Sequence, residues 1–282
     1  MSAPVATAPS HAPAQESAAR TQARARARAE RRDRWIWRVA GYVTFLAIWQ
    51  ITSSFLVEDF ILPPPADIAD EIGAIVSSNQ FVTHFSATVK NIAIGFSIAF
   101  VLGTVIGIAM GRSRWWEAFL SDWVMLTLTT PGLVFALVCA MVFGLGALGP
   151  IAAVVITSVS YVAVNVVEGV KAAPKDLGDM SRAFSVPWHR SLRHILLPFL
   201  APFFFTAARY GFSVSWKIAT LMEVIVGTKG IGFMMRSEFQ EFNMAGFLAW
   251  VLLFFAFALF LERGILQRQM RRFYRWRPEV SR

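Results

Sequence analysis

The chain has 282 residues, of which 56% are hydrophobic and only 16% are charged, and its mean hydropathy is +0.52. A soluble domain carries about 25% charged residues, so this composition excludes an ordinary soluble fold and favours an integral membrane protein. The net charge of +9 could suit nucleic-acid binding, but much of the excess lies just outside apolar stretches, where membrane topology explains it better. We therefore expect a lipid bilayer, and no nucleic acid, around the core. The single cysteine, Cys139, excludes an intrachain disulfide and a thiolate metal site.

Residues 1–34 are rich in Ala, Pro, Ser and Arg and end in a series of arginines. No apolar segment precedes a small-residue cleavage site, so this stretch is unlike an ordinary signal peptide. We predict a disordered basic tail on the cytoplasmic side, followed by one transmembrane permease domain over residues 35–282. An organelle transit peptide and a nucleic-acid-binding tail are the alternatives.

Charge-free runs predict the membrane crossings, since a spanning helix needs about 20 apolar residues. Runs over 39–57, 91–111 and 242–261 have this length, and the run 123–167 is long enough for two spans joined by a turn at 144–150. The remaining apolar stretch, 198–226, contains three charged residues. The sequence thus predicts an all-α, polytopic membrane protein with about six transmembrane helices. Most Lys and Arg residues outside the runs then fall on one side, which predicts that both termini are cytoplasmic.

The segment after the first predicted span contains three prolines and then Ile68, Ile72 and Ile75 at helical spacing. Its acidic residues occupy other faces of the helix. This pattern predicts a short helix at the external interface, and an ordinary amphipathic connector is an equal alternative.

The second predicted span has a small residue at every fourth position. These residues are Gly95, Ala99, Gly103, Gly107 and Gly111. Residues four apart share one helix face, and a groove of small side chains lets another backbone approach closely in lipid. We predict a helix-packing role for this face.

A polar and basic loop over 168–197 interrupts the apolar chain and contains a motif. The motif consists of Asp179, Met180 and Ser181, then Ser185, then Ile195, Leu197 and Pro198. Its spacing resembles the EAA loop of ABC importer permeases, whose pattern is Glu-Ala-Ala, three residues, Gly, nine residues, Ile, one residue, Leu-Pro. Four residues depart from that pattern, including Asp179 for Glu and Ser185 for Gly.

Other residues extend the resemblance from about residue 40 to the end. The second span matches the family at Gly95-Phe96, Gly103, Gly107 and Gly111-Arg-Ser113. The segment before the loop matches at Asn165 and Glu168-Gly-Val170. The region after the loop matches at Thr206, Arg209, Trp216, Glu223 and Gly230-Ile-Gly232. This last set is similar to the nitrate, sulfonate and taurine permeases. The resemblance implies a type I ABC importer permease fold and ATP-driven import of a small anionic or sulfonate-like solute by alternating access across the bacterial inner membrane.

The same resemblance implies the partners. These are cytoplasmic ABC ATPase subunits that use ATP-Mg, an extracytoplasmic substrate-binding protein and a second permease subunit. We expect that subunit to be an identical copy, in a homodimer, with a related chain as the alternative. It also implies that the 168–197 loop forms two short helices that dock on the ATPase. Leu177, Met180 and Phe184 fall near one helix face and would offer it an apolar ridge, with Pro187 ending that helix. If the turn at Ser185 needs a positive φ, serine adds strain that glycine avoids.

The stretch 198–226 is the predicted span whose residues are the candidates for lining a transport pathway. Its polar residues fall on about a third of the helix circumference, and the candidates for the pathway are Arg209, Ser213, Lys217, Thr220 and Glu223. A charged group is costly against lipid, so this stripe should face protein or water. Lys217 could attract an anion, or it could be paired within the helix bundle or extend its ammonium group to the membrane interface, and the sequence does not decide between these. For Arg209, near the cytoplasmic end, a structural role is favoured. For Glu223, near the external end, a role in holding a gate or a loop is favoured over contact with the substrate.

The chain contains no Gly-x-x-x-x-Gly-Lys-Ser/Thr phosphate-binding loop, and its four histidines show no metal-ligand spacing. We therefore predict that it is not an enzyme, binds no cofactor or metal, and depends on a partner for ATP hydrolysis. An ATP-independent secondary carrier or channel is the main alternative.

Overall fold

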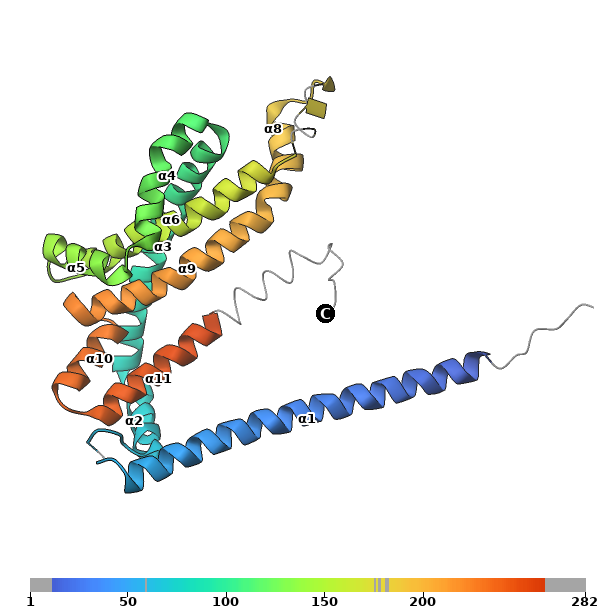
Figure 1. Cartoon of the computed structure of the whole chain (residues 1–282). Coiled ribbons are helices and arrows are strands. Elements are labelled where there is room, and N and C mark those ends of the chain that lie inside the picture. The colour runs from blue at the N-terminus through green and yellow to red at the C-terminus, as the bar shows by residue number, and fades with distance from the viewer. Residues whose placement is uncertain (1–11, 59, 175, 177–178, 181–182, 262–282) are drawn as a thin grey trace, which may run out of the picture. The chain divides into compact units, whose positions relative to one another are not determined.

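The computed structural model describes residues 12–58, 60–174, 176, 179–180 and 183–261 (Figure 1). Its elements are α1 (Ala12–Phe55), α2 (Pro65–Ser77), α3 (Asn79–Arg112), α4 (Arg114–Thr129), α5 (Gly132–Phe143), α6 (Leu148–Ala172), α8 (Trp188–Ser191), η1 (Leu192–Leu196), α9 (Leu197–Val226), α10 (Ile231–Gln240) and α11 (Met244–Phe260). The chain divides into two compact units, residues 1–65 and residues 66–282, and each is described by itself.

The first unit consists of α1 and the segment that follows it. The C-terminal part of α1 contains the predicted span 39–57. Residues 12–34, which we expected to be an irregular tail, continue this helix, and their many alanines and arginines are strong helix formers. At the other end, Trp49 Nε1 donates to the Pro63 carbonyl at 3.2 Å and Ser53 Oγ donates to the Leu62 carbonyl at 2.8 Å. These bonds fold the proline-containing segment back onto α1.

The second unit contains the other predicted spans and confirms the all-α, polytopic architecture. By length and hydropathy, α3 and α6 could each cross a membrane, and the bent pairs α4–α5 and α9–α10 could each form one further span. The 17-residue apolar helix α11 occupies the predicted run 242–261. The short helix predicted after the prolines is also present as α2, with Ile68 and Ile75 buried.

The run 123–167 contains a break that the sequence analysis did not predict. Helices α4 and α5 meet at 98° across Thr130 and Pro131. Proline has no N–H to donate and disfavours helical geometry in the residue before it, and Thr130 is accordingly extended, with φ −73° and ψ 130°. The predicted turn at 144–150 is confirmed, because α5 ends at Phe143, Gly144 adopts φ +62°, and α6 begins at Leu148.

Helices α3 and α6 form the centre of this unit. The small residues of α3 face a ridge on α6, in which Val154, Val162, Val166 and Val170 stand opposite Gly95, Gly103, Gly107 and Gly111. Each pair has the same offset along the chain, so the two helices run parallel. A methyl group added to any of these glycines would come within 3 Å of α6 atoms. Ala99, between the first two glycines, is fully buried.

Helix α9 packs on the other side of α6. Ser158 of α6 and Ser215 of α9 join their hydroxyl oxygens at 2.9 Å, and both side chains are fully buried. The apolar core around them draws on α3, α5, α6 and α9. Figure 1 shows α6 and α9 side by side, and α10 and α11 following from the end of α9.

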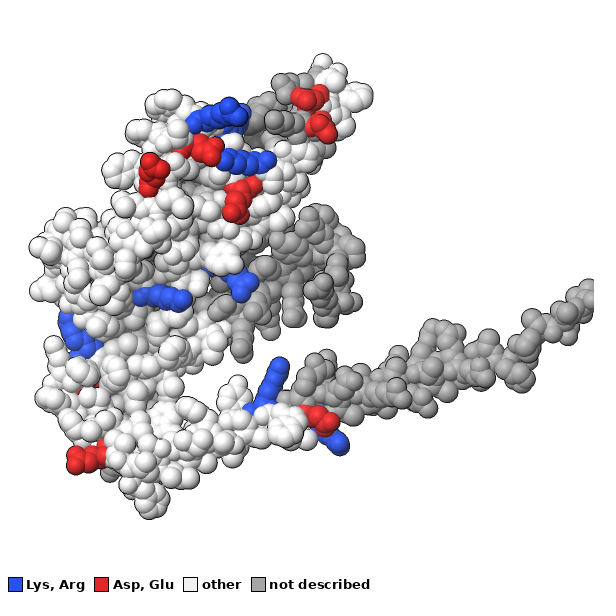
Figure 2. Space-filling view, in the orientation of Figure 1, with Lys and Arg blue, Asp and Glu red and all other residues white. Residues whose placement is uncertain are grey.

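The outer surface of this unit is mainly apolar. Large side chains are exposed on several helices, among them Val105 of α3, Trp123 of α4 and Met141 of α5. Figure 2 shows charged side chains gathered near α4 and α8 and few over the rest of the visible face. Such a surface is costly in water and suits a lipid environment.

Candidate functional site

The structure describes only part of the predicted coupling loop. Asp176, Asp179 and Met180 are helical and are followed by Ala183, which ends this turn of helix. Leu177 and Ser181 lie outside the described residues, as does the side chain of Ile195. The helix of the first half and α8 of the second half agree with two short helices separated by a turn. The docking role of these residues stays a prediction.

The apolar residues of this loop project away from the protein. Phe184 is 76% exposed and Met180 is 47% exposed, and the Phe184 N–H donates to the Met180 carbonyl at 3.1 Å. This backbone bond holds the two side chains on one side of the last helical turn. An exposed phenylalanine in a polar loop is unfavourable in water, and it is typical of a surface that a partner covers.

Ser185 makes the turn between the two helices with φ +52°. This left-handed conformation costs a non-glycine residue about 1 kcal/mol. It also corrects one expectation: the first helix ends at Ala183, before Pro187 is reached. Pro187 instead begins the second helix, where its carbonyl accepts from the N–H groups of Arg190 and Ser191 at 2.9 and 3.1 Å.

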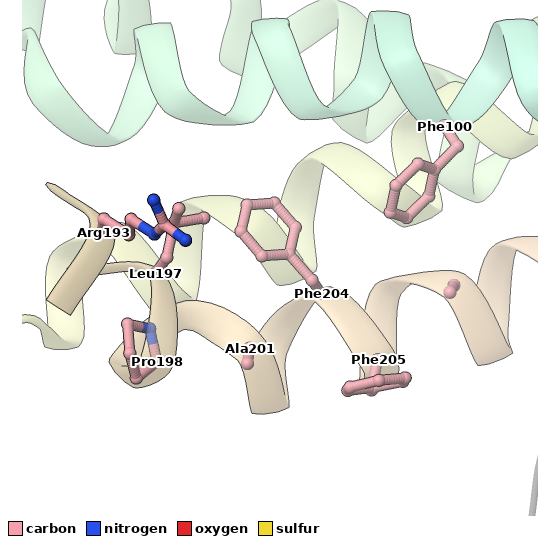
Figure 3. Close-up of a pocket in the computed structure, with 8 residues that line it drawn as sticks. Phe100, Arg193, Leu197, Pro198, Ala201, Phe204 and Phe205 are labelled. Atoms are coloured by element: carbon pink, nitrogen blue, oxygen red, sulfur yellow. The ribbon is translucent and has the colours of Figure 1, made fainter. Parts of the chain in front are cut away.

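The end of the loop leads directly into α9. The π-helical turn η1 joins α8 to α9, and Leu197 and Pro198 of the motif form the first turn of α9. Turns of this kind are frequent at functional sites. A cavity of about 520 Å³ lies beside this junction, lined by Phe100, Arg193, Leu197, Pro198, Ala201, Phe204, Phe205 and Ala208. Figure 3 shows Arg193 at one end and Phe100 of α3 at the other.

The predicted pathway residues of α9 do not share one environment. Arg209 and Ser213 are half-buried, and Lys217 is exposed. Thr220 is buried and donates its hydroxyl to the Trp216 carbonyl at 3.0 Å, one turn earlier in the same helix. Glu223 is fully buried. The stripe therefore separates into an exposed cation and a buried carboxyl group.

Lys217 lies about 14 Å before the end of α9, at about 1.5 Å per residue. Its ammonium group sits over the Trp216 ring, 5.9 Å from the centroid, and that ring packs against Phe254 of α11 at 4.7 Å. An exposed ammonium group at this depth is costly against hydrocarbon. The side chain should therefore face water, another protein chain or the membrane interface.

Glu223 is held by donors from two other helices. Its Oε2 accepts from Thr88 Oγ1 at 2.7 Å and from Gly232 N at 3.3 Å, and its Oε1 accepts from Asn91 Nδ2 at 3.1 Å. Sequence analysis missed Thr88 and Asn91, although they lie three residues apart and so share a face of α3. Within the described part of the chain, no group of three His, Cys, Asp or Glu side chains is placed to hold a metal ion.

Known proteins resemble this chain in sequence and in fold. The sequence profile of the family described as "binding-protein-dependent transport system inner membrane component" matches residues 99–272. The taurine transport system permease protein TauC of Escherichia coli strain K12 is 26% identical over 265 residues, which are 89% of this chain and 96% of TauC. The bicarbonate transport system permease protein CmpB of Synechococcus elongatus is 28% identical over 246 residues, which are 82% of this chain and 87% of CmpB.

Two solved structures share the fold. A chain of an amino acid ABC transporter superposes with a TM-score of 0.59 at 19% identity, covering 72% of this chain and 98% of that chain. A chain of an inward-facing MetNI methionine ABC transporter gives 0.57 at 18% identity, covering 66% and 93%. The shared architecture thus extends over nearly the whole length of each solved chain and over 66% to 72% of this chain.

A bundle of apolar helices, interrupted by a polar loop, defines a polytopic membrane protein. The profile match covers more than half of the sequence, and the chain belongs to the family of binding-protein-dependent transport system inner membrane components. It is accordingly the permease subunit of an ATP-driven ABC importer, and ATP hydrolysis belongs to a separate subunit.

Proposed function

We propose that this permease translocates a small solute with an anionic group across the bacterial inner membrane, with both termini in the cytoplasm. The exposed ammonium group of Lys217, on the polar stripe of α9, carries the substrate proposal. The relatives support it, since taurine, aliphatic sulfonates, bicarbonate and nitrate all contain an anionic group. An extracytoplasmic binding protein would deliver the solute.

We propose further that two identical copies enclose the pathway. A single copy leaves Lys217 exposed, and a second copy would supply the protein or water-filled surface that this charge needs. In alternating access, the ATPase dimer would close on ATP-Mg and move the loop 168–197. Since α8, η1 and α9 follow one another without an intervening loop, that movement would reach Lys217 along α9.

Cross-linking tests the proposed ATPase contact. Phe184→Cys places a thiol on an exposed site, whereas the native Cys139 is buried. We expect a cross-link between this residue and the ATPase subunit in the assembled transporter, and none from Phe119→Cys on α4, where the phenylalanine is similarly exposed. If cysteines at positions 180, 184 and 186 all fail to reach the ATPase, docking through this loop is refuted.

Lys217→Ala tests the proposed pathway. Losing a hydrogen bond to a charged group costs about 1.5–3 kcal/mol, so the substrate concentration for half-maximal transport should rise at least about tenfold. Lys217→Arg should retain most of the affinity, because it keeps the charge. Lys90→Ala, which removes another exposed lysine, is the matched control and should leave transport unchanged. Unaltered kinetics in the assembled Lys217→Ala transporter would remove this residue from the pathway.

A further inference from the structure

Helix α10 begins with three consecutive N–H groups that have no partner within the helix, as at any helix start. No side chain of its own first turn caps them. Side chains from α3 and α9 accept all three bonds instead. The pairs are Gly230 N to His84 Nδ1 at 3.2 Å, Ile231 N to Thr88 Oγ1 at 2.8 Å, and Gly232 N to Glu223 Oε2 at 3.3 Å. We call His84, Thr88 and Glu223 the crossed cap.

The Thr88 hydroxyl joins all three helices. It accepts from Ile231 N of α10 and donates to Glu223 Oε2 of α9, while Asn91 supplies a donor to the other carboxyl oxygen. Thr88 and Glu223 are fully buried and Asn91 is 7% exposed. Loss of the Thr88 hydroxyl would therefore remove two bonds from a buried site, where an unsatisfied polar group is costly.

The close approach of the helices depends on two glycines. Gly230 adopts φ +121°, and a methyl group there would collide with the Glu223 carboxyl group. A methyl group on Gly232 would collide with the Thr220 carbonyl and with Glu223 Cβ. Only hydrogen at these positions lets the start of α10 lie against α9.

A second set of bonds ties α10 to the end of α9. The Arg236 guanidinium donates to the Val224, Ile225 and Gly227 carbonyls at 3.2, 2.9 and 2.9 Å. The first two carbonyls belong to the last turn of α9 and the third to its C-cap residue, where a cation interacts favourably with the helix dipole. Although α9 and α10 meet at an angle of 42°, the bend is therefore held from both sides and is not a free hinge.

We propose that the crossed cap is a positioning device that makes α9, α10 and the first turns of α3 one rigid body, so that α10 carries the movement of α9 to the binding protein. The opposite end of α9 continues into η1 and α8. Beyond α10, Phe239 and Phe242 are 55% and 67% exposed and form the outer corner before α11. This inference rests on the proposed function for its orientation and its binding protein.

Distances between spin labels on α3 and α10 test the rigid body directly, without a measurement of transport or ATP hydrolysis. Labels replace the exposed Val82 of α3 and Gln240 of α10 in the assembled transporter in lipid vesicles. When labelled permease is diluted with excess unlabelled permease, so that most transporters contain a single labelled copy, we expect one narrow distance distribution, which Thr88→Val broadens and Thr88→Ser preserves, since serine retains the hydroxyl. Thr83→Val is the matched control, because that exposed hydroxyl bonds only within its own helix, to the Asn79 carbonyl. Glu223→Gln is a second variant that keeps the side chain's shape.

ATP hydrolysis by the same vesicles tests the transmission to the outside. Thr88→Val removes both the bond from Ile231 N and the bond to Glu223, so it should raise the concentration of loaded binding protein for half-maximal stimulation at least about fivefold, with basal hydrolysis unchanged. Unchanged narrow distances in both Thr88→Val and Glu223→Gln would overturn the rigid body. Broadened distances with unchanged stimulation would overturn the transmission. Absence of stimulation in the wild type would instead overturn the proposed function, while the distances would still report on the crossed cap.

Discussion

Replacing Phe184 with alanine is expected to reduce ATP-coupled transport by at least about thirtyfold, because truncating an aromatic interface anchor commonly costs about 2 kcal/mol or more. The side chain is 76% exposed, so its loss should leave the fold of the permease intact. The measurement is substrate uptake into vesicles containing the assembled transporter, together with a titration of the permease with its ATPase. We expect weaker ATPase binding to account for the loss of uptake.

Phe119→Ala is the control for this substitution. Phe119 is 55% exposed on α4 and stacks on Trp115, with ring centroids 5.5 Å apart, so it is an aromatic residue of comparable exposure outside the loop. Met180→Ala should have a smaller effect than Phe184→Ala, since Met180 is less exposed and presents no ring. Equal transport by the Phe184 and Phe119 variants would contradict an anchoring role for Phe184.

The resemblance to EAA loops predicted two short helices with a turn at Ser185, but the end of the first helix was placed wrongly. The apolar spacing placed Met180 and Phe184 on one helix face, and both are exposed. The helix was expected to end at Pro187, because proline is the strongest local helix breaker. It ends earlier because Ser185 adopts φ +52°, a conformation that its residue type does not indicate. Backbone strain of this kind depends on the surrounding structure.

For the contact between α3 and α6, the sequence predicted the packing face of α3 but not the partner helix. The small residues of α3 indicated a packing face, but nothing in that spacing identified α6 as its partner. The valine ridge has the same four-residue spacing, yet valines are so common in apolar spans that it carried no signal before the offset between Gly103 and Val162 was known. Pro131 was likewise overlooked, because the run 123–167 was divided by its lack of charge and not by backbone geometry.

The polar stripe of α9 shows what helical periodicity omits. Lys217 and Glu223 belong to one polar stripe but lie about 120° apart, at its two edges, and the structure leaves the first exposed and buries the second. Burial of Glu223 depends on Thr88 and Asn91, which lie more than 130 residues earlier in the chain. Local sequence could indicate that Glu223 needed partners, as it did by favouring a structural role, but it could not name them.

Gly107→Val is expected to prevent close packing of α3 on α6. A Cβ atom at this position would lie 2.7 Å from both the Ala163 carbonyl oxygen and Val166 Cβ, and neither can move aside as the end of a flexible side chain could. Overpacking typically costs about 1–3 kcal/mol, and backbone contact places this case at or above the upper value. For a chain of this size, about 3 kcal/mol corresponds to a fall of roughly 6–12 °C in the unfolding midpoint.

The measurement is the thermal unfolding midpoint of the purified permease in detergent, with Gly73→Ala as the matched control. Gly73 lies inside α2 with no atom within 4 Å of an added methyl group. Alanine there should stabilise the helix by about 0.5–1 kcal/mol, since it restricts the unfolded chain and favours helix. A lower unfolding midpoint for Gly107→Val together with a higher midpoint for Gly73→Ala would show that the contact with α6 causes the destabilisation at Gly107. If Gly107→Val raised the midpoint as Gly73→Ala does, helix propensity, and not this contact, would determine the response, and the close packing of α3 on α6 would lose its role in stability.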